Sequence, residues 1–164
     1  SITLDEYKKY LDEYGSFIEG FASPFNSQAV MLNQKFCSIF PELDRPYGSI
    51  CNFFDLDVQG ETIIINPPFV EDILLEAAKK CIKLSEKNKV IFRGPNWKDA
   101  EFYLLLEERV NPFKRKRTFS FKLSYTYSEK NLNKKILKKN TYQYENFKDG
   151  STFNAPFDSV EFYN

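Results

Sequence analysis

The first residues of the chain repeat apolar side chains with the period of an amphipathic helix. These apolar positions are Leu4, Tyr7, Leu11 and Tyr14. Thr3 and Glu6 form a capping-box pattern at the start, in which each side chain accepts a hydrogen bond from the other residue's backbone N–H. The spacing therefore predicts a helix over residues 3–14.

Three shorter elements are expected next. Residues 17–18 predict a short strand that breaks into the loop 21–26, because glycine and proline interrupt the apolar pattern there. Residues 29–40 predict a helix, which ends where a proline follows. The apolar run 50–54 predicts a short buried strand that ends at Asp55.

The middle of the chain alternates strand and helix patterns. The β-branched run 62–65 is typical of a parallel strand buried on both faces, and it leads directly into Asn66-Pro67-Pro68-Phe69. An apolar stripe predicts a helix over 70–86, followed by a strand at 89–92 that Gly and Pro break, and a helix over 98–108. This alternation predicts an α/β fold with a mostly parallel sheet flanked by helices.

The C-terminal third has a different character. Residues 118–127 alternate rings with polar side chains, as an antiparallel strand does, and residues 159–163 predict a final strand. Between them, the Lys/Asn-rich stretch 129–150 is expected to be a long, mobile connection.

Length favours one domain over two, since 164 residues is close to the commonest domain size. Within a single domain, 1–164, we expect an N-terminal helix (1–16), a core that binds the ligands (17–110), and a basic loop with C-terminal strands (111–164).

Composition excludes several classes of protein. No apolar run approaches the ~20 residues of a membrane span, and the acidic start has no secretion-signal pattern. The chain has no histidine, which excludes Ser-His-Asp and Cys-His hydrolases. Cys37, Cys51 and Cys81 are scattered without a CxxC pair, so neither a disulfide framework nor a metal site is expected. An intracellular, reducing compartment fits best, with nucleus and cytoplasm not distinguished.

Charge is divided unevenly along the chain. Residues 1–82 hold 6 Lys/Arg and 13 Asp/Glu, whereas residues 83–164 hold 17 and 10. A polyanionic partner such as RNA would therefore approach the second half. The densest basic run is Lys114-Arg115-Lys116-Arg117, which is a candidate phosphate-binding segment, with an ordinary solvated charge run as the alternative.

Asn66-Pro67-Pro68-Phe69 carries the clearest chemistry. Parallel sheets bind ligands at the carboxyl ends of their strands, where this motif falls. Each proline lacks an N–H, so the Asn66 carboxamide and the Pro67 carbonyl are acceptors without competing backbone donors. Together they suit the two N–H groups of an aromatic amine, and Phe69 suits stacking on a flipped-out base. The alternative is a Pro-Pro kink that only ends a strand.

The sequence resembles the catalytic domain of the phosphorylated-CTD-interacting factor family, the cap-specific mRNA adenosine N6-methyltransferases. The resemblance covers roughly residues 17–100. It rests on ordered blocks: Phe21-Ala22-Ser23-Pro24-Phe25-Asn26, Cys37-Ser38-Ile39-Phe40-Pro41, Tyr47-Gly48-Ser49, Asp55, Gly60, Asn66 to Phe69, and Pro95-Asn96-Trp97.

The resemblance implies a Rossmann-like class I methyltransferase fold, S-adenosylmethionine as methyl donor, and capped mRNA beginning with adenosine as acceptor. The implied catalytic turn is residues 66–69. Glu19, Ser23 and Asn26 are candidates to hold the donor's amino-acid end, and Asp55 to receive its ribose or adenine. Each of these four could instead be a turn or cap residue.

Trp97, the only tryptophan, is a candidate wall of the acceptor pocket, with core packing as the alternative.

Two departures from the family pattern leave other functions open. Family members usually continue Gly-Ser with Arg-Gly, whereas Ile50-Cys51 follows Ser49 here. Members also precede the core with a helical domain and often a WW module, so the cap-binding or helical part is expected to come either from a longer natural chain or from a protein partner. The alternatives are a catalytically inactive subunit that binds RNA or protein, and an adenine methyltransferase acting on DNA or internal RNA sites.

Overall fold

The computed structural model describes residues 2–22, 27–112, 130–145 and 151–164. Their central feature is a seven-stranded sheet of order β3-β2-β1-β4-β5-β9-β6. The strands are β1 (Ile18–Glu19), β2 (Lys35–Ser38), β3 (Ser49–Asn52), β4 (Thr62–Ile65), β5 (Lys89–Pro95), β6 (Asn133–Leu137) and β9 (Ser159–Tyr163). The first five strands in this order are parallel, and β9 is antiparallel to both of its neighbours.

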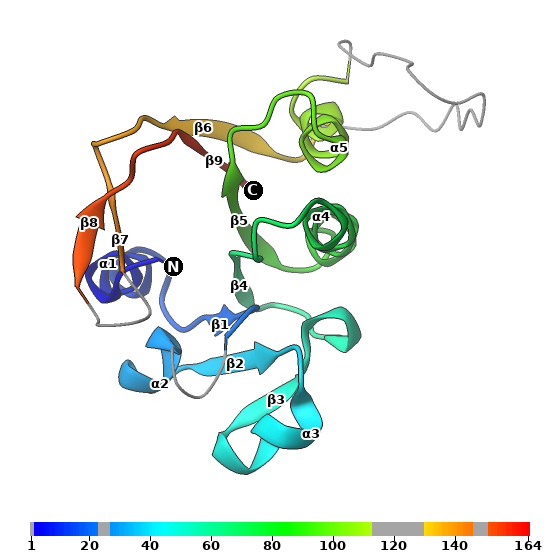
Figure 1. The fold of residues 1–164 in the computed structure, drawn as a ribbon. Helices are drawn as coiled ribbons and strands as arrows, with labels where there is room; N and C mark the ends of the chain where they lie inside the picture. The colour runs from blue at the N-terminus through cyan, green and yellow to red at the C-terminus, as the bar shows by residue number, and fades with distance from the viewer. Residues whose placement is uncertain (1, 23–26, 113–129, 146–150) are drawn as a thin grey trace.

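Helices and a small hairpin cover the two faces of this sheet (Figure 1). One face carries α4 (Glu71–Leu84) and α5 (Glu101–Val110), and the other carries α1 (Leu4–Tyr14), α2 (Gln28–Met31) and the hairpin of β7 (Gln143–Glu145) and β8 (Thr152–Asn154). The short helix α3 (Pro41–Asp44) and the 3-10 turns Arg45–Tyr47 and Phe53–Asp55 lie around β3. This is the α/β, Rossmann-like arrangement that the sequence predicts.

Strand β4 lies at the centre of both cores. Its three isoleucines are fully buried, and successive side chains point to opposite faces. Ile63 and Ile65 pack with α4 and α5, whereas Ile64 packs on the side of α1. The prediction of a strand buried on both faces is confirmed, as are the helix after it, the helix α5, the first helix with its Thr3 cap, and the last strand.

The predicted helix over 29–40 is wrong. Only residues 28–31 are helical, and Asn33 then adopts a left-handed conformation with φ 57°. The following residues form β2, where Phe36 and Cys37 are buried on opposite faces of the sheet. Residues 35–38 form a strand because they pair with β1 on one side and with β3 on the other. These partners are not neighbours in the sequence, so the local helical spacing does not reveal the strand.

Two predictions for the second half are also wrong. The stretch 129–150, expected to be a connection, contains β6 and β7. The strand predicted at 89–92 continues through Gly94 and Pro95, because β9 pairs with it along that length. A side chain at Gly94 would approach the rings of Phe92 and Phe102 closely, so glycine serves packing there and does not end the strand. The strand predicted at 118–127 lies outside the described residues.

No helix among the described residues is both long and apolar enough to cross a membrane.

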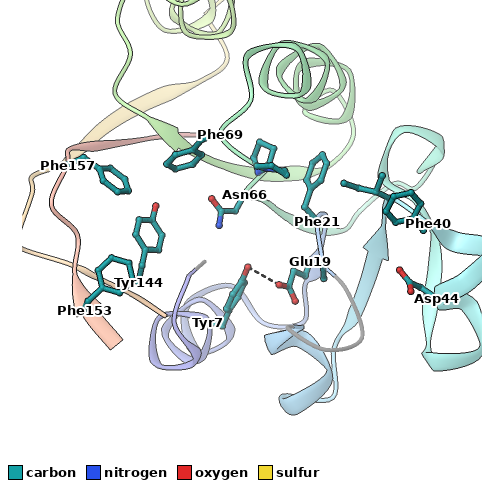
Figure 2. Close-up of a pocket in the computed structure, with 14 residues that line it drawn as sticks. Tyr7, Glu19, Phe21, Phe40, Asp44, Asn66, Phe69, Tyr144, Phe153 and Phe157 are labelled. Atoms are coloured by element: carbon teal, nitrogen blue, oxygen red, sulfur yellow. Dashed lines mark hydrogen bonds between the residues drawn. The ribbon is translucent and has the colours of Figure 1, made fainter. Parts of the chain in front are cut away.

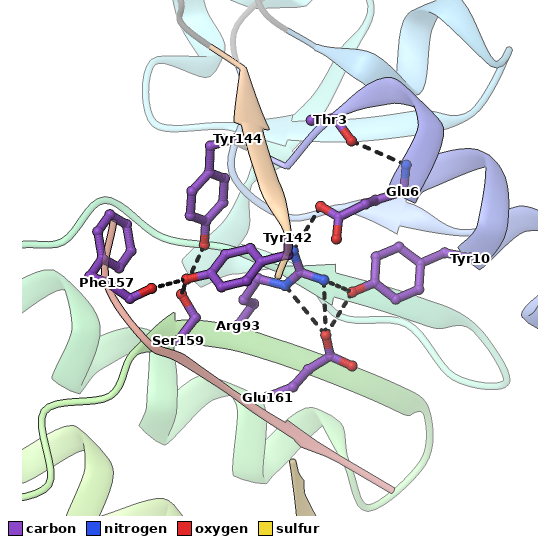
Figure 3. A network of polar contacts seen from close by, with 9 residues as sticks. All are labelled: Thr3, Glu6, Tyr10, Arg93, Tyr142, Tyr144, Phe157, Ser159 and Glu161. Carbon is purple, nitrogen blue, oxygen red and sulfur yellow. Dashed lines mark hydrogen bonds and ion pairs between the residues drawn. The ribbon is translucent and has the colours of Figure 1, made fainter. Parts of the chain in front are cut away.

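Arg93 on β5 is buried and joins the two ends of the chain (Figure 3). Its guanidinium donates to the Glu6 carboxylate at 2.9 Å and to the Glu161 carboxylate at 3.1 Å. It also donates to the hydroxyl of Tyr10, which in turn donates to Glu161 at 2.7 Å. These acidic neighbours raise the pKa of Arg93 and outweigh the opposing effect of burial. The network therefore fixes α1 and β9 to the centre of the sheet.

We expect Arg93→Met to lower the free energy of unfolding by about 3–5 kcal/mol, because it leaves the buried Glu161 carboxylate and the half-buried Glu6 carboxylate without their partner. Denaturant titration followed by circular dichroism measures this change. Lys79→Ala is the control, since it removes an exposed Lys79–Glu76 pair and should cost less than about 1 kcal/mol. Similar losses in the two variants would contradict a central role for Arg93.

Candidate active site

A pocket of about 470 Å³ lies at the carboxyl ends of β1 and β4. These two strands are neighbours, but the chain continues from β1 towards β2 and β3 on one side and from β4 towards β5 on the other. Ligands of open α/β sheets bind at such a reversal of strand order. The pocket is lined by Tyr7, Glu19, Phe21, Ala22, Ile39, Phe40, Asp44, Asn66, Pro67, Pro68, Phe69, Tyr144, Phe153 and Phe157.

Glu19, the last residue of β1, is a buried carboxylate at this pocket (Figure 2). It accepts hydrogen bonds from the Tyr7 hydroxyl at 3.2 Å, the Ser27 hydroxyl at 3.0 Å and the Ala29 backbone N–H at 2.9 Å. Burial raises the pKa of Glu19, and these three hydrogen bonds act in the opposite direction. The carboxylate thus joins β1 to α1 and α2 while it faces the pocket.

Gly20 lets the chain turn tightly after Glu19. Its N–H donates to the Ile64 carbonyl at 2.8 Å, and a Cβ at this position would lie 2.9 Å from the ring of Phe53. Glycine is therefore required because the backbone passes close to the Phe53 ring and to the Ile64 carbonyl. The sequence lacks a G-x-G pattern here, but Gly20 alone supplies the close backbone contact.

The turn Asn66-Pro67-Pro68-Phe69 connects β4 to α4 at the pocket. The Val70 N–H donates to the Pro68 carbonyl at 2.8 Å and closes the turn. The side-chain oxygen of Asn66 is buried and has no hydrogen-bond partner among the described residues. An unpaired buried acceptor costs free energy, about 1–3 kcal/mol, and points to a ligand that supplies an N–H or O–H donor.

Aromatic rings form the side of the pocket beside this turn. Phe69 contacts Phe157 edge to face with ring centroids 5.7 Å apart, and Phe157 stacks on Tyr144 at 5.7 Å. Phe153 of β8 completes this side. In Figure 2 these rings lie at one end of the pocket, whereas Phe40 and Asp44 lie at the other, with Asn66 and Glu19 between them.

Among the sequence-predicted residues that the structure describes, most lie together, but not all. Glu19 and residues 66–69 line the same pocket. Trp97 lies next to it, where it contacts Phe69 edge to face at 6.1 Å and lines a separate hollow of about 280 Å³. Asp55 is exposed in a 3-10 turn and is not among the lining residues. Ser23, Asn26 and the basic run 114–117 lie outside the described residues.

Several lining residues were not predicted as site residues from the sequence. Phe40 and Asp44 reach the pocket because β2 ends there, and the erroneous helix over 29–40 hid that strand end. Tyr7 belongs to a helix that was predicted, yet no local pattern indicates that its hydroxyl meets Glu19. Tyr144 and Phe157 come from the stretch expected to be a connection and from the segment just after it.

A doubly wound α/β sheet with a pocket at its reversal point defines a Rossmann-like fold. A family model described as the phosphorylated CTD interacting factor 1 WW domain matches residues 5–130. The chain belongs to the phosphorylated CTD interacting factor 1 family. The match includes Glu19 and the whole turn 66–69, and in this chain the matched segment contains helices and the parallel strands. Membership in this family is consistent with a methyltransferase.

We expect Asn66→Ala to leave the free energy of unfolding unchanged or to raise it by up to about 1–3 kcal/mol, because the side-chain oxygen makes no hydrogen bond to lose and is a buried acceptor without a partner. Denaturant titration measures the change. Asn88→Ala is the matched control: Asn88 accepts from the Glu61 N–H and donates to the carbonyls of Val58 and Leu84, so its loss should cost about 1–3 kcal/mol. Equal costs would assign Asn66 a structural role.

Proposed function

We propose that this chain is the methyltransferase domain of its family and methylates the exocyclic N6 amine of adenosine in RNA. The observation that carries the proposal is the unpartnered side-chain oxygen of Asn66 in a pocket bounded by rings. An adenine N6 amine supplies the missing donor, and its flat ring fits against Phe69. We further propose the cap-adjacent adenosine of mRNA as acceptor, on the basis of the family.

The strand order supports S-adenosylmethionine as donor. The five parallel strands run in the order 3-2-1-4-5 that doubly wound nucleotide-binding sheets use, and the antiparallel strand β9 lies between the fifth strand and the edge strand. The pocket residues fit the donor, since Glu19 offers a carboxylate for its ammonium group and Phe40 an apolar surface for its adenine. When bound, S-adenosylmethionine supplies an electrophilic methyl group.

The residues of the turn account for the acceptor chemistry. Asn66 Oδ1 and the Pro67 carbonyl each accept one N–H of the amine, which orients the nitrogen lone pair towards the methyl carbon. A bound sulfonium donor would supply the methyl group and leave as S-adenosylhomocysteine, and the methylated amine would then lose its extra proton to water. No strong base is required in this scheme, which agrees with a chain that contains no histidine.

Two further proposals concern partners and compartment. The excess of Lys and Arg after residue 82 supports RNA as the polyanionic partner. Cys37 Sγ and Cys51 Sγ lie 3.7 Å apart and all three cysteines are free thiols, which supports a reducing intracellular compartment.

We expect methyl transfer from labelled S-adenosylmethionine to adenosine-initiated RNA, and a fall in kcat on the order of 100-fold or more in Asn66→Ala, because the amine loses its positioning acceptor. Scintillation counting of the RNA measures the rate, and capped RNA, uncapped RNA and duplex DNA compete to rank the acceptors. A wild-type rate no higher than that of Asn66→Ala would contradict the catalytic proposal and favour an inactive binding subunit.

We expect the affinity for S-adenosylmethionine to fall as the pH is lowered through the raised pKa of Glu19, because only the carboxylate attracts the donor's ammonium group. The decline should begin above the usual glutamate value of 4.5. Calorimetric titration across this range measures it. In Glu19→Gln the amide oxygen still accepts from Ser27 and Ala29, so we expect a folded protein with about tenfold weaker, pH-independent binding.

Glu76→Gln, which changes an exposed carboxylate on α4, is the control and should bind the donor as the wild type does. A wild-type affinity that stays constant as the pH falls towards 4.5 would remove Glu19 from the donor site.

A further inference from the structure

Three rings of the pocket come from the C-terminal part of the chain, and we call Tyr144, Phe153 and Phe157 the C-terminal wall. Tyr144 lies on β7, Phe153 on β8, and Phe157 in the turn that leads to β9. Phe153 and Phe157 stay 41% and 36% exposed, which is unusual for large rings that have a core available. Neither the strand order nor the proposed catalytic turn explains why rings gather here.

The wall belongs to the end of the pocket where the acceptor would lie. Phe157 touches Phe69 of the turn directly, and the other end of the pocket is bounded by Phe40 and Asp44 (Figure 2). None of the three wall residues carries a charge, and burial raises the pKa of Tyr144, so its hydroxyl stays neutral. Such a surface suits a flat, uncharged ring better than a phosphate or an ammonium group.

Buried hydroxyl groups fix this wall to the sheet (Figure 3). The Tyr142 hydroxyl donates to the Phe157 carbonyl at 2.7 Å and lies 2.6 Å from Ser159 Oγ. Ser159, the first residue of β9, is fully buried and lies 3.2 Å from the Tyr144 hydroxyl. Tyr142 and Ser159 thereby fix the positions of Phe157 and Tyr144. Tyr142 and Ser159 themselves do not line the pocket.

We propose that the C-terminal wall is the base-stacking surface of the acceptor site, with Tyr142 and Ser159 as its positioning residues. This inference rests on the proposed function, because it takes the nucleobase of an RNA as the ring that is bound. The wall selects for a stacked base, whereas Asn66 selects for its amine. Specificity for the acceptor is then divided between β4 and a C-terminal segment more than 70 residues later in the chain.

A thermodynamic cycle between Phe157 and the base tests the wall. Fluorescence anisotropy with S-adenosylhomocysteine present measures binding of adenosine-initiated RNA and of the same RNA with an abasic first position. Phe157→Ala should weaken binding of the first RNA about tenfold, the loss typical of one ring–base stack, and leave the abasic RNA unaffected. Equal weakening of both RNAs, or no wild-type preference for the base, would overturn the inference.

The same measurements separate this inference from the proposed function. If Phe157 and the base are coupled in a protein that transfers no methyl group, the base-stacking role of the wall is supported and the proposed methyltransferase activity is contradicted. If methyl transfer occurs without such coupling, the activity is supported and the base-stacking role is contradicted.

The positioning role is tested by Tyr142→Phe, which keeps the ring and removes the hydroxyl. We expect the KM for RNA to rise several-fold while kcat and the KM for the donor stay unchanged. Partial unfolding alone would lower kcat and leave both KM values as they are. Tyr103→Phe is the matched control, because Tyr103 is a buried tyrosine packed with α4 and α5 on the opposite face of the sheet. An unchanged KM for RNA in Tyr142→Phe would remove Tyr142 as a positioning residue.

Discussion

The buried guanidinium of Arg93 is the interaction on which the rest of the structure depends. Taking a charge out of water costs several kcal/mol unless opposite charges and hydrogen bonds surround it. Those partners come from the two ends of the chain, Glu6 and Tyr10 on α1 and Glu161 on β9. The parallel strands can therefore bury Arg93 only when the first helix and the last strand are both in place. The buried charge of Arg93 thus couples the folding of the first helix to that of the last strand.

The Arg93 network also helps to position the pocket, because residues that line or support the pocket lie on the same elements as the partners of Arg93. Tyr7 follows Glu6 on α1 and reaches Glu19, while Ser159 lies on the same strand as Glu161 and holds the rings of the C-terminal wall. The isolated bridge between Ile2 and Tyr144 brings the start of the chain to the hairpin. The parallel core supplies the turn 66–69, and the two ends of the chain supply other surfaces that line the same pocket.

Whether an element could be predicted from the sequence depends on how far apart in the sequence its interacting residues lie. The strand 62–65, its turn and the helix after it are encoded by adjacent residues, so β-branching and helical spacing predict them. The strands β2 and β6 are decided by partners far along the chain, and the lysines and asparagine of β6 resemble a loop. Asn66 and Glu19 were accessible to motif reasoning, whereas Phe157 gave no local signal.

Two polar residues at the pocket show how structural and functional demands can be told apart. Glu19 already accepts three hydrogen bonds, and a carboxylate has about four acceptor positions, so it holds the fold together and retains room for one ligand N–H. Asn66 has a buried oxygen with no partner among the described residues, so the free protein gains nothing from it. A chain that keeps such an acceptor next to exposed rings bears a cost that a bound hydrogen-bond donor would remove. Under the proposed function, Glu19 serves both the fold and the ligand, whereas Asn66 serves the ligand alone.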